Sequence, residues 1–216
     1  PAPALAADTG LAVQVTTYPD TCQAADGLVL PGARSTVSDL EWLRRSGIAD
    51  VVARRAEQGR TVVGICGGYQ MLCRTILDPD GQETTPGSVV GGLGLLPVEV
   101  DFAATKTLAL SHGTWRGIEV GGYEIHHGVC RSLEDAEAFL DGVHVGPVWG
   151  TMWHGAFEHD EFRRTWLADA ARHAGSSWRP RADELGYQAR REAMIETLAD
   201  ALEAHVDVDR ILHLAR

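Results

Sequence analysis

The sequence contains little of what nucleic-acid binding or membrane insertion requires. Its 216 residues hold 19 Lys and Arg against 30 Asp and Glu, which gives a formal net charge of −11. Because no basic patch or arginine-rich arm offsets this charge, a nucleic-acid surface is not expected. No run approaches the roughly 18 apolar residues of a membrane span, and no signal peptide opens the chain. We therefore expect neither nucleic acid nor membrane among its partners.

Cysteine is also scarce, and its spacing predicts neither disulfides nor a metal site. The four cysteines lack paired spacing, which favours a reducing, cytoplasmic location. There is no Cys-x-x-Cys and no His-Glu-x-x-His pattern, so no bound metal is predicted. The chain begins at Pro1 without a methionine, and we expect it to be a fragment or a processed product.

The most informative stretch that is present covers residues 62–72. A β-branched run ends in Gly64-Ile65-Cys66-Gly67-Gly68, and an apolar-periodic helix follows. This is the Gly-x-nucleophile-x-Gly elbow, with cysteine where α/β-hydrolases carry serine. The N–H groups at the start of the helix would favour the thiolate, so a lowered pKa is expected. We predict that Cys66 is a nucleophile; the alternative is a buried structural cysteine.

The pattern of elements predicts an α/β fold with a mostly parallel open sheet, helices on both faces and a β-rich insert. Further strands are predicted at several places in the glycine-rich middle, between residues 89 and 129. The helix after Cys66 is expected to include Ile76. We expect a single domain over residues 1–216, in which 1–10 form a linker end. Strands are expected at 11–17, 28–30, 61–65 and 148–153, and longer helices at 36–58, 161–174 and 190–206.

A cysteine nucleophile needs a base, and His154 is the favoured candidate. It directly follows the predicted strand 148–153, and the carboxyl ends of parallel strands share one edge of a sheet with Cys66. His126 and His127 form another cluster, but neighbours on a strand point to opposite faces, so at most one faces the site. Nine histidines are present, and a histidine at a strand end is often only a packed or surface residue.

Attack on an amide also requires donors for the oxyanion, and two backbone sources are predicted. One is the N–H of Gly67, directly after the nucleophile, and the other is Gly32 in the turn Pro31-Gly32-Ala33. The stretch that continues to Thr36 lacks the spacing and the lysine of a P-loop, so no ATP site is predicted in this chain.

Several motifs in one order resemble the class I glutamine amidotransferases, which have a flavodoxin-like sheet. Within that class they are most similar to the C-terminal glutaminase domains of the cobyric acid synthase family. The resemblance covers roughly residues 25–166. The motifs are Leu30-Pro31-Gly32-Ala33-Arg34-Ser35-Thr36, the elbow through Leu72, Gly91-Gly92-Leu93-Gly94-Leu95-Leu96-Pro97-Val98, Gly122-Tyr123-Glu124-Ile125-His126-His127-Gly128, and His154-Gly155.

The resemblance implies that Cys66 forms a glutamyl thioester and that His154 acts as general base and acid. It also implies that Gln70 helps to hold the substrate glutamine, and we assign Tyr123 and His126 to substrate binding. Ammonia would pass to a synthetase domain, absent here, where ATP and Mg²⁺ activate carboxylates of the corrin substrate in cobalamin biosynthesis. No cofactor is expected in this domain itself.

The sequence departs from the wider class at one position. Many members place Glu two residues after the histidine, and here that residue is Ala156, so a Cys–His dyad is expected. Glu158 and Asp160 lie nearby but are expected to belong to the solvated entry of the next helix.

Three other interpretations stay open. The first is the glutaminase subunit of a complex that amidates the cell-wall precursor lipid II, which has a similar elbow and His-Gly motif. The second is a cobyrinate a,c-diamide synthase domain, which is less similar at the elbow. The third is a non-catalytic binding or regulatory domain of the same fold.

Overall fold

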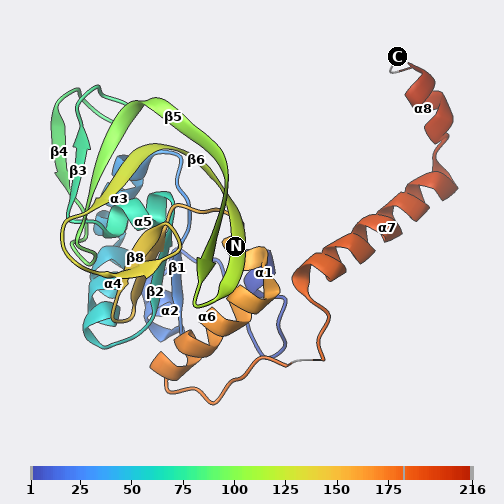
Figure 1. The fold of residues 1–216 in the computed structure, drawn as a ribbon, viewed down its shortest axis with the longest axis horizontal. Coiled ribbons are helices and arrows are strands. Elements are labelled where there is room, and N and C mark those ends of the chain that lie inside the picture. Colours follow the sequence, from blue (N-terminus) through green and yellow to red (C-terminus); the bar gives the residue numbers. More distant parts are fainter. Residues whose placement is uncertain (1, 182, 215–216) are drawn as a thin grey trace.

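A five-stranded mixed sheet forms the centre of the molecule, in a computed structural model that describes residues 2–181 and 183–214 (Figure 1). Its strand order is β1-β2-β9-β8-β7, in which β1, β2 and β9 are parallel and the other two antiparallel. The expected α/β class is present, and within this sheet the parallel pairing is confined to these three strands. The strands are β1 (Leu28–Leu30), β2 (Val62–Ile65), β7 (Glu137–Phe139), β8 (Gly142–Val145) and β9 (Val148–Thr151).

The predicted β-rich insert forms a second, four-stranded sheet with the order β4-β3-β5-β6. Its long strands β5 and β6 meet in a two-residue hairpin turn at Arg116 and Gly117, whose φ values are 52° and 81°. Positive φ at both positions is the requirement of a type I′ turn. The strands are β3 (Thr75–Asp78), β4 (Ser88–Gly91), β5 (Val98–Trp115) and β6 (Ile118–Ser132).

Eight α-helices and one 3₁₀ helix are assigned in the described residues. The helix α5, which follows the elbow, packs against β1, β2 and β9, whereas α6 contacts β6. The helices are α1 (Ala2–Leu5), α2 (Pro19–Ala24), α3 (Thr36–Ser46), α4 (Ile48–Glu57), α5 (Gly67–Leu72), η1 (Ala156–Glu158), α6 (Asp160–His173), α7 (Tyr187–His205) and α8 (Val208–Leu214).

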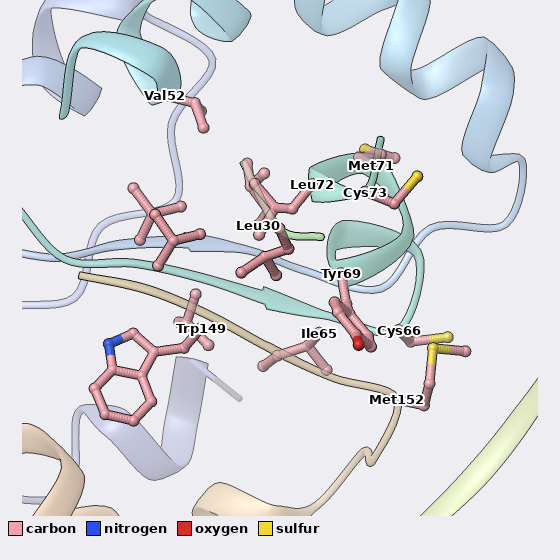
Figure 2. Packing of buried hydrophobic residues seen from close by; sticks show 14 of the residues in the cluster. Leu30, Val52, Ile65, Cys66, Tyr69, Met71, Leu72, Cys73, Trp149 and Met152 are labelled. Atoms are coloured by element: carbon pink, nitrogen blue, oxygen red, sulfur yellow. The ribbon is translucent and has the colours of Figure 1, made fainter. Parts of the chain in front are cut away.

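The core covers both faces of the parallel strands. All four residues of β2 are buried, as a strand covered on both sides requires. In Figure 2, Val52 of α4 and Leu72 of α5 lie on one side of the strands, and Ile65 and Trp149 on the other. Trp149 contacts Trp166 of α6 edge to face, with ring centroids 6.4 Å apart.

Several sequence expectations about local structure were wrong. Residues 11–17 form no strand, because the alternating β-formers find no neighbouring strand to pair with. The single helix expected over 36–58 is two helices, since Gly47 adopts φ 79° and ends the first. The helix after Cys66 ends at Leu72, so Ile76 lies in β3. The expected helices near the C-terminus are present, with ends shifted by at most three residues.

Residues 1–10 were expected to be a linker end, and the described part of that segment instead packs against the body. Ala4 and Leu5 are buried in α1, and Asp8 is 2% exposed. The Asp8 carboxylate accepts a hydrogen bond from Arg163 of α6 at 2.7 Å. The division of the chain into one domain stays a prediction.

Candidate active site

Cys66 occupies a sharp turn between β2 and α5. Its φ of 51° and ψ of −111° are outside the regions that most residues adopt. The Cys66 N–H donates to Thr151 of β9 at 2.8 Å, and its carbonyl accepts from Gln70 at 2.9 Å. A Cβ at Gly64 would lie 2.6 Å from the backbone of Gly68, so only glycine permits α5 to pack this closely. The predicted strand–turn–helix elbow is therefore present.

Burial sets the protonation state of the Cys66 thiol. The residue is 5% exposed, and burial raises its pKa to about 11 although a hydrogen bond from the Gly67 N–H opposes the shift. The expected lowering of the pKa was wrong, because α5 has only six residues and loss of water outweighs its dipole. Cys66 is thus a thiol at neutral pH in this structure.

His154 follows β9 and is held by backbone and ring contacts with β6. It forms an isolated antiparallel bridge with Tyr123, in which the two residues exchange backbone hydrogen bonds of 2.9 and 3.0 Å. The Tyr123 ring stacks on the imidazole with centroids 5.1 Å apart. Burial, and then the charge of His126, lower the pKa of His154, so that the ring is neutral at pH 7. A neutral imidazole can accept a proton.

The two segments predicted to supply oxyanion donors lie against each other and against His154. A Cβ at Gly32 would lie 2.8 Å from the Cε1 atom of His154. A Cβ at Gly67 would lie 2.7 Å from the backbone nitrogen of Ala33. The turn after β1 therefore touches both the elbow and the imidazole. The role of Gly32 and Gly67 as donors stays a prediction.

Gln70 lies on the buried side of the elbow helix. Its side chain is 2% exposed, and its Oε1 atom accepts a hydrogen bond from Thr36 Oγ1 at 2.8 Å. Its Nε2 atom lies 3.9 Å from the sulfur of Met152, directly after β9. These contacts fix the amide between α3 and the end of β9. Its predicted part in holding substrate is not tested by these contacts.

The predicted histidine pair on β6 divides between two environments. His126 Nε2 lies 2.9 Å from Glu124 Oε2, and Glu124 also accepts a hydrogen bond from Ser111. Although burial alone would raise it, these bonds hold the pKa of Glu124 below its usual value. His127 instead contacts the carbonyl of Ala103. The side chains of His126 and Glu124 are close enough to the site to influence His154 and Cys66 electrostatically.

Sequence reasoning missed Asp141, in the turn between β7 and β8. Its carboxylate accepts hydrogen bonds from Thr151 Oγ1 at 2.5 Å and from the N–H of Met152 at 3.1 Å. Burial of this carboxylate raises its pKa, and its charge in turn raises that of Cys66. In the sequence, Leu140-Asp141-Gly142 is an ordinary turn, and no local signal marks Asp141 as part of the site.

The space beside His154 is small. A cavity of about 70 Å³ is lined by Ile65, Tyr123, Trp153, His154, Gly155, Phe157 and Glu158. Glu158 lies 3.7 Å from Arg191, and Ala156 is fully buried.

Among the described residues, no group of three His, Cys, Asp or Glu side chains could hold a metal ion. No helix in the described part of the chain is long and apolar enough to cross a membrane.

Comparison with protein families shows to which family the chain belongs. The profile of the CobB/CobQ-like glutamine amidotransferase domain matches residues 3–162. The chain belongs to this family. The predicted class of glutamine amidotransferase is thereby confirmed, and residues 163–216 lie beyond the matched domain.

Individual relatives agree with the family. The chain is 94% identical over 213 residues to a cobyric acid synthase of Cutibacterium acnes. The aligned region covers 99% of this chain and 44% of that protein. It is 45% identical to the cobyric acid synthase of Mycolicibacterium gilvum, over 42% of that protein. The chain thus spans less than half the length of these relatives. A crystal structure of a glutamine amidotransferase superposes with a TM-score of 0.58 at 22% identity, covering 77% of this chain and 88% of the other, which supports the fold.

Proposed function

We propose that this glutamine amidotransferase domain hydrolyses glutamine through a thioester on Cys66 and supplies ammonia to the remaining part of a cobyric acid synthase. The observation that carries the proposal is the pair formed by Cys66 at the elbow and His154 after the neighbouring parallel strand. The relatives' name, cobyric acid synthase, supports a corrin acceptor, and we propose that ATP and Mg²⁺ activate its carboxylates in the part outside this chain.

The first half of the proposed reaction releases ammonia. His154, neutral at pH 7, takes the thiol proton as Cys66 attacks the side-chain carbonyl carbon of glutamine. The carbonyl oxygen becomes an oxyanion that the Gly67 and Gly32 N–H groups stabilise, and each such donor contributes about 3–4 kcal/mol. The imidazolium returns the proton to the departing nitrogen as the C–N bond breaks, which leaves ammonia and a glutamyl thioester.

The second half regenerates the enzyme. His154 takes a proton from water, whose oxygen attacks the thioester carbonyl. As the C–S bond breaks, the imidazolium gives this proton to the leaving sulfur, which yields glutamate, the Cys66 thiol and a neutral His154. Two features of the site bear on the role of His154 in this cycle. The Tyr123 ring and backbone hold the imidazole in one orientation. Ala156 leaves His154 without the carboxylate of a triad, so we assign catalysis to a dyad.

The other interpretations receive less support. The relatives carry the name cobyric acid synthase, which favours the corrin pathway over amidation of lipid II. The presence of Cys66 and His154 at adjoining strand ends argues against a domain that has lost catalysis. We place the reaction in the cytoplasm, where the four free cysteines would stay reduced.

The proposal is tested by the fate of Cys66. We expect Cys66→Ser to abolish ammonia release from glutamine, and Cys73→Ser, the matched change at a buried cysteine after α5, to retain it. A glutamine analogue with an alkylating side-chain group should add its mass to the Cys66 peptide, measured by mass spectrometry. Equal ammonia release from the Cys66→Ser variant and the unmodified protein would overturn the proposal.

A further inference from the structure

Helix α7 extends away from the body (Figure 1). It presents an apolar stripe to solvent. None of its 19 residues is buried. Met194, Ile195, Leu198 and Leu202 are between 49% and 57% exposed. Their spacing of three and four residues places them on one face of the helix. Such a stripe on a helix normally packs against another element.

Among the described residues, the hydrogen bond and the ion pair that join α7 to the body both lie in its first turns. The Tyr187 N–H donates to Asp160 at 2.8 Å, and Arg191 lies 3.7 Å from Glu158. The apolar stripe begins after these contacts and continues toward α8, where Ile211 and Leu212 are also exposed. The body of the domain therefore holds the base of α7 and leaves its stripe uncovered.

Charge along α7 disfavours a second copy of the chain as the occupant. Glu192 and Glu203 form an acidic edge on one side of the stripe, whereas Glu196 and Asp200 lie nearer the opposite face of the helix. Among the described residues, no basic side chain forms an ion pair with these four carboxylates. An antiparallel pair of copies, which keeps the two bodies apart, would set this edge against itself, and the like charges would repel. The edge instead fits a partner with Lys or Arg beside an apolar groove.

The comparisons indicate which partner this is. The family profile ends at residue 162, so α7 lies outside the shared domain. Matches to the much longer relatives nevertheless cover 99% of this chain, which includes α7. The segment thus accompanies the domain in proteins of which this chain spans only 44% and 42%.

We propose that the apolar stripe and acidic edge of α7 dock onto the part of the full-length polypeptide outside this chain. The docking site would be an apolar groove edged by Lys or Arg. This proposal rests on the proposed function only in naming that part as the consumer of ammonia. Docking through α7 would keep the glutaminase domain close to the site where ammonia is used.

Hydrogen exchange in the full-length polypeptide tests the docking. We expect the α7 amides to exchange about tenfold or more slowly there than in the 216-residue chain. Leu198→Asp should remove this protection. Thr197→Asp, its matched control, adds the same charge one residue away on a face turned by about 100° and should keep the protection.

Activity measurements separate docking from catalysis. In the full-length polypeptide, Leu198→Asp should lower glutamine-driven amidation while amidation driven by added ammonium salt is unchanged. Ammonia release by the 216-residue chain should be unaffected, because Leu198 contacts no core residue. If α7 docks but ammonia release does not depend on Cys66, the docking stands and the proposed function fails.

Three results would overturn the proposal. The α7 amides could exchange equally fast in both proteins, or the Leu198→Asp and Thr197→Asp variants could behave alike in the full-length polypeptide. The third is protection of α7 in the 216-residue chain that grows with protein concentration, which would make a second copy the occupant.

Discussion

Replacing Gly32 by Ala should disable the proposed site without unfolding the protein. The added methyl would lie 2.8 Å from His154 Cε1, whereas ordinary contacts begin at 3.4 Å, so the imidazole must retreat by about 0.6 Å. It cannot retreat freely, because the Tyr123 ring stacks on it and backbone hydrogen bonds to Tyr123 hold the residue. Displacements of this order at a reacting group cost about 10²-fold in rate, or about 2.7 kcal/mol of activation free energy.

The assay is the rate of ammonia release at saturating glutamine, with unfolding in urea measured on the same samples. Gly27→Ala is the matched control, since its methyl would meet nothing within 4 Å. We expect the control to retain full activity and Gly32→Ala to lose about 10²-fold, with both proteins unfolding near the urea midpoint of the unmodified protein. A folded Gly32→Ala variant with undiminished activity would refute the assignment of His154 as the base held against this turn.

Two further predictions concern protonation. Burial raises the pKa of Cys66 to about 11, so its alkylation rate in this chain should keep rising with pH beyond 9, and a plateau by pH 8 would contradict the buried thiol. Burial alone would raise the pKa of Asp8, but hydrogen bonds from Arg163 and Arg164 lower it below the unfolded value of about 3.9. The ionised Asp8 therefore stabilises the fold at pH values above about 3.9, and this contribution is lost as the pH falls through the lower pKa of the folded state. Asp8→Asn leaves the buried Arg163 guanidinium with only the partly exposed Asp160 as a carboxylate partner, and it should cost about 3 kcal/mol in urea unfolding at pH 7, with a weaker acid dependence than the unmodified protein. Exposed Asp183→Asn is its control, and equal midpoints for the two variants would contradict the prediction.

Local patterns predicted the elements that carry the nucleophile. Residues 28–30 and 62–65 are short apolar runs between turn residues, a pattern that favours strands, and the second run is buried throughout. The elbow glycines were informative because a sharp strand-to-helix turn excludes side chains from a few fixed positions. Alternation failed at residues 11–17, where a strand also needs a neighbour that no local pattern reveals.

The surroundings of the predicted base depended on distant residues. The position of His154 after a strand was visible in the sequence, but its stacking on Tyr123 and its contact with Gly32 join three distant segments. Asp141 was missed for the same reason, because its carboxylate reaches Thr151 of β9 only when β8 pairs with β9.

The sequence alone determined which residue types stand at the elbow, the turn after β1 and the end of β9, because short-range backbone geometry restricts those residues. Only the tertiary structure decided how they are charged. Burial by side chains from several elements raises the pKa of Cys66, against the expectation from the helix that follows it. Desolvation depends on everything packed around a group, whereas the backbone angles of a turn depend on a few consecutive residues.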